Sequence, residues 1–376
     1  MNNPFKDILA KVSNLGSGSS PNAVGIDIGT SSIKVVEIKK KGGKAMLETY
    51  GSISLGPYAD TDIGRVTNLP TAKIVEALKE VLKQSGTTTN SVVLSIPIQS
   101  SLVFTIPLPM EVKEGGDITS IVTTEARKYI PVPITEVSLD FFVLPEKELS
   151  YEEANNPDLP KKISEKTEVL VVAIQNDAIT RLREIVSGCA LEASFFEVEI
   201  FSSIRANFEH ELSPVLLIDF GASRTKLSLI EFGMIKSYHT INRGGADITD
   251  AISKSLSIPF GEAEEMKKEF GLYGSPVETE LAGIIKVHMD YIFSETSSVL
   301  LGYEKKYDKT IAKVILTGGG ALMKGLKELT ESNFHGEIEV GHPFSKVGAP
   351  AFLEKVLEAT GPEFAVAIGL ALRKLQ

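Results

Sequence analysis

The chain has 376 residues, of which 43% are hydrophobic and 23% charged, so it is long enough for two domains with separate cores and has the composition of a globular protein. Its net charge of −10 disfavours a general nucleic-acid or anionic-membrane surface, because both need concentrated Lys and Arg. Its single cysteine, Cys189, excludes a disulfide framework, and no apolar run reaches the length of a membrane span, so we expect a cytoplasmic protein.

The first 22 residues differ in character from the rest. Apolar residues recur there at helical spacing, and a Gly/Ser stretch at 16–20 separates them from the first strand. Two turns of helix are too short to be stable alone. This segment is therefore either a frayed extension or a piece that docks on a partner or a membrane.

From residue 23 to residue 96 the pattern alternates between strands and one helix. We predict strands at 25–29, 33–39, 46–55 and 91–97 and a helix at 73–84. Hairpins followed by a crossover helix are typical of a mixed sheet with a covered face. The hairpin between the first two strands reads GIDIGTSSIKVVEI, and it turns through Gly29 after the strand ends at Asp27.

The same motif recurs at residues 217–230 as LIDFGASRTKLSLI. Equivalent positions hold Ile26, Asp27, Gly29, Ser31, Lys34 and Ile38 in one copy and Ile218, Asp219, Gly221, Ser223, Lys226 and Ile230 in the other. The Gly lets an anion approach the backbone, hydroxyls add donors, and Asp at the strand end can hold Mg²⁺ through water. One copy could be only a tight turn. Two copies predict a clamp for the phosphates of a nucleotide.

Residues 97–190 interrupt the first pattern. We predict strands at 101–108, 136–144, 168–174 and 190–198 and helices at 117–129 and 177–187, which together form a compact unit of two helices and about four strands. Residues 145–167 are rich in Glu, Lys, Asn and Pro and predict an exposed loop within this unit.

The second half begins after Ser213 with its own hairpin and continues with helices up to Phe270 and a long helix at about 278–306. A short strand then runs into Thr317 and three glycines, followed by a helical pattern. Alone, three glycines are only a loop signal, but this arrangement lets a flat base or ribose lie against bare backbone. The chain ends in an apolar helix at 361–376, which we expect to be buried against the first domain.

Taken in order, these segments resemble the PilM family of type IV pilus assembly proteins and, more distantly, the FtsA division proteins. The segments are GIDIGTSSIKVVEI, EARKYIPVPITEVSLDFFVL, LLIDFGASRTKLSLI, RGGADITDAI, AEEMK, ILTGGGALMKGL and AVAIGLALR, and the resemblance covers the chain from about Ala23 to Leu375. FtsA characteristically continues into an amphipathic membrane helix, which we do not find here, so we expect the PilM family.

The resemblance implies an α/β fold of the actin-like (ribonuclease H-like) type, with two domains around a nucleotide and an FtsA-type inserted subdomain 1C (SHS2-like). The implied boundaries are an extension at 1–22, domain 1A at 23–96 and 191–212, subdomain 1C at 97–190, domain 2A at 213–243 and 311–360, domain 2B at 244–310, and a C-terminal helix at 361–376 that returns to domain 1A.

The resemblance also implies the residues that bind ATP or ADP with Mg²⁺. The first phosphate loop comprises Asp27, Gly29, Thr30, Ser31 and Ser32, with Lys34 on the next strand, and the second comprises Asp219, Gly221, Ser223 and Thr225. Gly244 and Gly245 would wall the nucleotide, Glu264 and Lys267 would reach ribose and base, and Gly318, Gly319, Gly320 and Met323 would form the adenosine loop. Asp27 and Asp219 are the expected Mg²⁺ ligands, through water.

Two of these assignments have plain alternatives. Glu264 and Lys267 could be an exposed ion pair at i, i+3 on a charged helix. Arg224 in the second loop could contact phosphate or point to solvent. The residue that would position water for hydrolysis is not identified, because Gln99 is equally a turn residue and Glu125 is better explained as structural. We therefore expect ATPase activity to be weak or absent.

For the PilM family the resemblance implies a cytoplasmic scaffold that binds the short cytoplasmic tail of the inner-membrane protein PilN. Other inner-membrane and motor components of pilus assembly and self-association are further expected contacts, with no nucleic acid and only indirect membrane contact. An FtsA-like filament-forming protein is one alternative. A small-molecule kinase is another, but it needs a substrate-side Asp base that we do not find.

Overall fold

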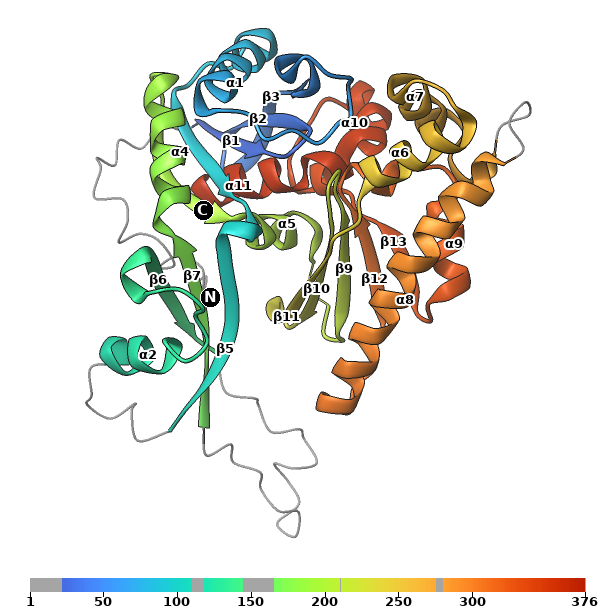
Figure 1. The fold of residues 1–376 in the computed structure, drawn as a ribbon. Coiled ribbons are helices and arrows are strands. Elements are labelled where there is room, and N and C mark those ends of the chain that lie inside the picture. The colour runs from blue at the N-terminus through green and yellow to red at the C-terminus, as the bar shows by residue number, and fades with distance from the viewer. Residues whose placement is uncertain (1–21, 110–117, 145–165, 210, 275–279, 376) are drawn as a thin grey trace. The chain divides into compact units, whose positions relative to one another are not determined.

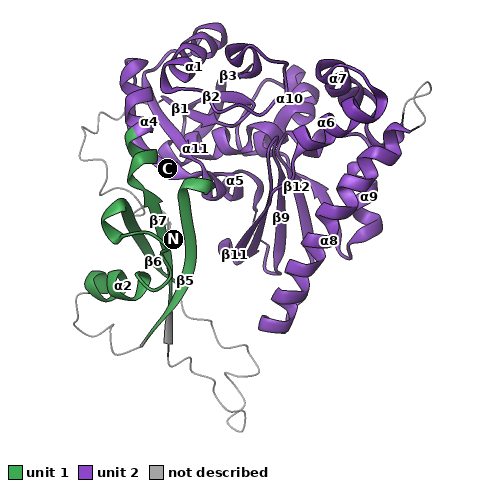
Figure 2. Cartoon of the chain, in the orientation of Figure 1, with its two compact units in different colours: residues 1–14, 98–180 green, residues 15–97, 181–376 purple. Residues whose placement is uncertain are grey.

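The computed structural model describes residues 22–109, 118–144, 166–209, 211–274 and 280–375. Its described residues divide into two compact units (Figure 2), one within residues 98–180 and the other within residues 22–97 and 181–375. We call them the inserted unit and the hairpin unit. The segment at 1–21 and most of the polar loop expected at 145–167 lie outside the described residues.

The first sheet of the hairpin unit has the order β3-β2-β1-β4-β8. Its strands are β1 (Asn22–Ile28), β2 (Ser32–Lys41), β3 (Lys44–Ser54), β4 (Ser91–Ile96) and β8 (Glu192–Val198). β1 pairs antiparallel with β2 and parallel with β4, and β4 pairs parallel with β8. The sheet is therefore mixed, as the sequence predicted.

Helices cover both faces of this sheet (Figure 1). α1 (Thr71–Ser85) packs against β2 and β3, and the C-terminal α11 (Ala365–Leu375) packs against β1, β2 and β4. The approach of α11 is so close that a Cβ on Gly25 of β1 would lie 1.9 Å from the carbonyl oxygen of Ala367. This is why the last helix is apolar on nearly all sides, with Ala367 and Ile368 fully buried.

A buried charge cluster fixes α11 to α5 (Glu199–Asn207). Glu197 accepts hydrogen bonds from Ser202, Arg205 and Arg373, and Arg205 also donates to the carbonyl of Gly369 at 3.0 Å. Burial would raise the pKa of Glu197, but the two guanidinium groups, Arg205 first, hold it below its usual range. The carboxylate therefore stays ionised inside the fold.

The second sheet repeats the first, with the order β11-β10-β9-β12-β13. Its strands are β9 (Val215–Phe220), β10 (Thr225–Glu231), β11 (Met234–Ile241), β12 (Lys313–Thr317) and β13 (Glu337–Val340). Here too the first strand pairs antiparallel with the second and parallel with the fourth. The duplication seen in the hairpin motif thus extends to a whole sheet.

The helices of the second half are α6 (Gly245–Leu256), α7 (Phe260–Phe270), α8 (Leu281–Tyr307), α9 (Leu326–Asn333) and α10 (Glu354–Thr360). Apolar residues of α6, α7, α8 and α9 share one core with β9, β10 and β12. Within it lie Ile285, Met289 and Ile292 of α8, at the helical spacing that the sequence showed.

The inserted unit is built on an antiparallel sheet of order β5-β7-β6. Its elements are β5 (Ser101–Pro109), α2 (Ile118–Ala126), β6 (Val137–Val143), β7 (Lys166–Gln175) and the first turns of α4 (Asn176–Gly188). Val122 and Ala126 of α2 are buried against Ile106, Val169 and Val171 of the sheet.

The sequence pattern grouped the strand at 190–198 with this unit, whereas the boundaries implied by the resemblance ended the unit at 190 and gave 191–212 to domain 1A. The structure pairs that strand, β8, with β4 in the first sheet, and the inserted unit ends at Thr180. The sequence of β8, EASFFEV, mixes polar and apolar residues, and a strand of this composition fits either sheet. The expected division of the hairpin unit into 1A, 2A and 2B stays a prediction.

Candidate functional site

Each copy of the repeated motif forms a hairpin closed by a glycine. In the first, Asp27 of β1 pairs with Lys34 of β2, and the Gly29 amide donates to the Ser32 carbonyl at 3.0 Å. In addition, Asp27 Oδ1 accepts a hydrogen bond from Ser95 Oγ at 2.8 Å. Because Ser95 is buried at the end of β4, it fixes the orientation of the carboxylate.

The second hairpin has the same geometry. Asp219 of β9 pairs with Lys226 of β10, and the Gly221 amide donates to the Arg224 carbonyl at 3.0 Å. Arg224 Nε donates to Asn242 Oδ1 at 2.9 Å. The guanidinium group has further N–H donors, so a contact between Arg224 and phosphate stays a prediction. Both hairpins thus present an Asp at a strand end beside a tight turn.

The tips of the two hairpins face each other. Thr30 Oγ1 donates to Ser223 Oγ at 3.3 Å, although the residues are 193 positions apart and belong to different sheets. Both residues are only half buried. The two tips therefore bring hydroxyl groups to one place, as a clamp requires.

Lys226 forms an ionic bridge between the two halves of the hairpin unit, each of which is built on one of its two five-stranded sheets. Its Nζ lies 2.7 Å from Glu199 Oε2 on α5 and 3.3 Å from Asp219 Oδ2 on β9. Burial disfavours the charge, but the surrounding carboxylates, Asp219 first, hold the pKa of Lys226 well above its usual range. Lys226 is therefore a permanent cation below the hairpin tips. Lys34 at the equivalent position donates to Ser32 Oγ at 2.9 Å.

Gly244 and Gly245 pack the start of α6 against the second hairpin. The Gly245 amide donates to the Gly221 carbonyl at 2.9 Å, and the Ala246 amide donates to the Ala222 carbonyl at 2.9 Å. A Cβ on Gly244 would lie 2.4 Å from the Ala222 carbonyl oxygen. The glycines are thus required for this close contact, while their place in a nucleotide site stays a prediction.

Glu264 and Lys267 form an internal ion pair, not the exposed pair of the plain alternative. Lys267 Nζ donates to Glu264 Oε2 at 2.6 Å, to the Gly245 carbonyl at 2.9 Å and to Thr249 Oγ1 at 2.7 Å. Burial would raise the pKa of Glu264, but Lys267 and then Thr249 hold it below its usual range. The pair ties α7 to the first turn of α6.

The glycine turn after β12 lies directly beside Asp219. Gly318 has φ of +81°, and a Cβ there would lie 2.3 Å from Asp219 Oδ1 and 2.7 Å from the Phe220 carbonyl oxygen. A Cβ on Gly320 would lie 2.7 Å from the Cβ of Phe220. Gly319 is exposed, and the side chain of Met323 is half-buried against the core of the second half. The turn therefore brings bare backbone to the second hairpin.

Thr225 and Ser31 make their observed contacts within the fold. Thr225 is fully buried and donates its hydroxyl to the Arg243 carbonyl at 2.9 Å. The Ser31 carbonyl accepts from the Leu55 amide at 2.8 Å, which anchors the tip of the first hairpin. The assignment of Thr225 and Ser31 to nucleotide binding stays a prediction. In the structure, Thr225 has no solvent-accessible surface.

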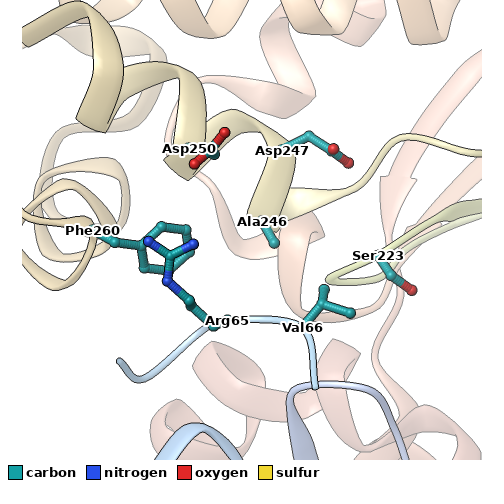
Figure 3. Close-up of a pocket in the computed structure, with 7 residues that line it drawn as sticks. All are labelled: Arg65, Val66, Ser223, Ala246, Asp247, Asp250 and Phe260. Carbon is teal, nitrogen blue, oxygen red and sulfur yellow. The ribbon is translucent and has the colours of Figure 1, made fainter. Parts of the chain in front are cut away.

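A cavity of about 370 Å³ opens beside the second hairpin tip (Figure 3). Its lining comes from the segment after β3, the second hairpin, α6 and the start of α7: Arg65, Val66, Ser223, Ala246, Asp247, Asp250 and Phe260. Ser223 belongs to the residues that the sequence assigned to the site, but Arg65, Asp250 and Phe260 do not. The guanidinium carbon of Arg65 lies 4.0 Å from the centre of the Phe260 ring.

A family model described as type IV pilus assembly protein PilM matches residues 25–375. The chain belongs to the PilM family. Among solved structures, the PilM-PilN type IV pilus biogenesis complex has a chain that is 27% identical, with a TM-score of 0.76 and coverage of 94% of this chain and 98% of that one. The expected family and its role in type IV pilus assembly are thereby confirmed.

FtsA proteins are sequence relatives of this PilM-family chain. That of Staphylococcus epidermidis is 27% identical over 85% of this chain and 74% of its own length, and that of Pseudomonas aeruginosa is 25% identical over 94% and 89%. The structure of MreB5 of Spiroplasma citri bound to ADP agrees in fold, with 14% identity, a TM-score of 0.50 and coverage of 93% and 95%. The expected actin-like α/β fold is therefore confirmed.

Sequence reasoning missed four residues that shape this site in the PilM-family chain: Ser95, Glu199, Arg65 and Phe260. Ser95 ends a predicted strand and could have been inferred, because the ends of parallel strands meet at one edge of a sheet. Glu199, Arg65 and Phe260 carry no motif, since each acts through a contact with a distant segment.

The geometry of the two Asp residues suits a hydrated Mg²⁺. Each carboxylate has one oxygen with a protein partner, Ser95 for Asp27 and Lys226 for Asp219. At Asp219 the other oxygen faces Gly318, where a Cβ would fill the space. Within the described residues no group of three or more His, Cys, Asp or Glu side chains could hold a metal directly. The donors therefore fit a cation bound through water.

Proposed function

We propose that this PilM-family protein binds ATP or ADP with Mg²⁺ between its two hairpins and, in that state, holds the cytoplasmic tail of a PilN-like inner-membrane protein. The observation that carries the nucleotide part is the contact between Thr30 and Ser223 at the facing hairpin tips. Hydroxyls and tight glycine turns on two sides of one point are suited to a phosphate chain.

The charges around the tips support phosphate binding. Lys34 and Lys226 follow the two turns at equivalent positions, and Lys226 is held as a cation by Glu199 and Asp219. Asp27 and Asp219 would hold hydrated Mg²⁺, which supplies the remaining positive charge against the phosphates. Gly318 and Gly320 offer backbone without side chains next to the same hairpin, where a ribose or base could approach.

The partner is inferred from the similar chain found in a PilM-PilN complex. The inserted unit supports this role, because the order β5-β7-β6 leaves β5 and β6 at the edges of its described sheet. An extended peptide can add to such an edge strand by main-chain hydrogen bonds.

Deletion of residues 146–165, which are poor in apolar groups, should leave tail binding nearly unchanged. A tenfold loss would instead place the peptide site in that segment.

This function gives the protein a cytoplasmic location, with membrane association through partners. Across the described residues, the helices are too short or too polar to span a bilayer. Other inner-membrane and motor components and self-association belong to the same proposal. Gln99 and Glu125 lie in the inserted unit. Weak or absent hydrolysis of ATP stays a prediction.

The direct test is whether nucleotide remains with the protein. The full chain would be purified in Mg²⁺, passed through gel filtration, denatured, and its supernatant analysed for ATP and ADP. Protein stripped of nucleotide would then be titrated with Mg-ATP by calorimetry. Bound nucleotide, or tight binding on titration, supports the proposal. If neither is found, the nucleotide part of the proposal is wrong.

A further inference from the structure

The turn between β2 and β3 carries a concentrated positive charge. Lys39, Lys40 and Lys41 end β2 and Lys44 begins β3, and Lys40, Lys41 and Lys44 are exposed. The acid that precedes them, Glu37, is fully buried and accepts hydrogen bonds inside the fold. Within the described residues, no carboxylate lies at ion-pair distance from the four lysines. Their charges are therefore presented outward.

Two of these lysines repel each other. Lys41 and Lys44 are direct cross-strand partners, and like charges directly opposite each other destabilise a hairpin. The turn itself is made by Gly42 and Gly43, with φ of +58° and +79°, and needs no charged neighbour. The equivalent turn of the second sheet, at 231–234, contains no lysine. The lysines are thus unfavourable for the hairpin alone, and an anionic surface would remove their repulsion.

An exposed apolar edge adjoins the same hairpin. The Gly348 amide donates to the Ala45 carbonyl at 2.8 Å, and the Leu47 amide donates to the Gly348 carbonyl at 2.8 Å, so the chain at Gly348 lies along β3. Four positions later Phe352 is 81% exposed, and four positions further Val356 is 48% exposed. Exposed apolar side chains beside lysines are typical of surfaces that enter the headgroup layer of a bilayer.

Both ends of the described chain lie at this edge of the first sheet. Asn22, the first described residue, pairs with Lys39, and the Leu375 carbonyl accepts a hydrogen bond from Lys40 Nζ at 3.0 Å. Residues 1–21, for which the sequence offered membrane docking as one explanation, therefore join the fold beside the lysines. Two sequence features that suit a membrane are thus attached at one place.

We propose that the lysine turn (residues 39–44) and the apolar edge (residues 350–356) dock directly on a bilayer that contains anionic lipid. The lysines are attracted to the lipid phosphates, and Phe352 enters the layer between headgroups and acyl chains. The apolar edge adds no net charge, because Glu354 and Lys355 offset each other. The net charge of −10 does not prevent this contact, since the attraction acts over about 10 Å and depends on the local charge.

This contact goes beyond the proposed function, because it needs neither nucleotide nor a partner tail. A nucleic acid would use the charge of the lysine turn but leave the apolar edge in water, so the observations favour a bilayer. A direct contact and a tail held by the same protein would strengthen each other, because the second binding event becomes intramolecular.

The first experiment measures binding of the full chain to vesicles, without nucleotide or peptide. Vesicles of phosphatidylcholine alone are compared by co-sedimentation with vesicles that contain about one third phosphatidylglycerol, at low and at high salt. We expect binding to the anionic vesicles at low salt, its loss at high salt, and little binding to phosphatidylcholine. Equal binding to both kinds of vesicle, or none to either, overturns the proposal.

The double variant Lys41→Gln, Lys44→Gln tests the lysine turn. Each lysine near an anionic surface contributes about fivefold to binding, so the variant should bind about 10- to 30-fold more weakly. Its thermal stability should equal or exceed that of wild type, because a like-charged pair is removed. Lys286→Gln with Lys305→Gln, at exposed positions of α8, removes the same charge elsewhere and should bind as wild type. Equal effects of the two double variants contradict docking through the lysine turn.

A fluorescent side chain tests the apolar edge. The sequence contains no tryptophan, so Phe352→Trp introduces a single reporter, and Leu301→Trp, at a position 55% exposed on α8, is the control. With anionic vesicles the emission of Phe352→Trp should move to shorter wavelength, and that of Leu301→Trp should not. No shift, or a shift that follows protein concentration without vesicles and so reports contact between copies, overturns the proposal. Failure to bind nucleotide or tail would refute only the proposed function.

Discussion

Thr30 and Ser223 are joined by a hydrogen bond of 3.3 Å between their hydroxyl oxygens, so the two hairpin tips touch. A phosphate group that entered between them would replace this neutral bond with charge-assisted bonds to both hydroxyls, which are the stronger kind. In the proposed function, the two tips would have to separate from this contact to admit a phosphate. It also explains why residues of both hairpins should affect one ligand.

The first prediction concerns the two strand-end carboxylates. Asp27→Ala and Asp219→Ala should each weaken binding of Mg-ATP, by several kcal/mol at most, because each removes one proposed water-mediated ligand of Mg²⁺. Calorimetry measures the affinity, and thermal unfolding without nucleotide checks the fold. Asp290→Ala, at an exposed position of α8, is the control. Wild-type affinity in both variants would exclude the duplicated clamp.

The second prediction concerns the glycine beside Asp219. Gly318→Ala places a Cβ 2.3 Å from Asp219 Oδ1 at a φ of +81°, so either the turn or the carboxylate must move. We expect a loss of about 1–3 kcal/mol in the free energy of unfolding and weaker Mg-ATP binding.

Gly302→Ala is the matched control, because a Cβ at Gly302 meets no atom within 4 Å and the residue lies inside α8. This change should stabilise the protein by about 0.5–1 kcal/mol. Both values follow from chemical denaturation. Equal stability of the two variants would show that the contact with Asp219 imposes no strain.

The third prediction is a pH dependence that arises at Glu197. Its pKa is lowered in the folded protein by Arg205 and Arg373, so its stabilising contribution is full above the pKa of the unfolded chain and is lost as pH falls through the lowered folded pKa. Glu197→Gln leaves two buried guanidinium groups without their counter-charge and should cost about 3–5 kcal/mol at neutral pH.

Denaturation across pH 7 to pH 3 tests this linkage. The wild-type protein should lose stability below about pH 4.5, the ordinary range of Glu, whereas Glu197→Gln should lose less over the same interval. Exposed Glu265 of α7, changed to Gln, is the control and should follow the wild-type curve. Parallel curves for wild type and Glu197→Gln would show that another group controls acid stability.

The fourth prediction links nucleotide to the partner. A ligand changes the affinity for a second ligand only through its differential binding to the states of the protein, and such coupling is typically about 1–3 kcal/mol. A synthetic peptide of the PilN-like tail should therefore bind about 5- to 150-fold differently with and without saturating Mg-ATP. Titration of the peptide into apo, ADP-bound and ATP-bound protein measures this. One affinity in all three states would make the nucleotide a purely structural cofactor.

The family, the fold class and the repeated hairpin could be predicted from the sequence because each depends on motifs and apolar spacing within short segments. In both copies, an Asp at the end of an apolar strand is followed by Gly29 or Gly221, and this pattern predicts a hairpin with a tight turn. The apolar α11 likewise had to be buried, and Gly25 shows where its backbone approaches the first sheet.

Only the tertiary structure decided which distant residues meet. Periodicity shows which face of an element is buried, but it does not identify the partner across 193 positions that separate Thr30 from Ser223. The bridge from Lys226 to Glu199 and the stack of Arg65 on Phe260 depend on how the two halves of the hairpin unit pack together. The turn of Lys267 toward Gly245 depends on how α7 packs on α6. These contacts join side chains that are each ordinary in sequence, so their role is fixed by the fold alone.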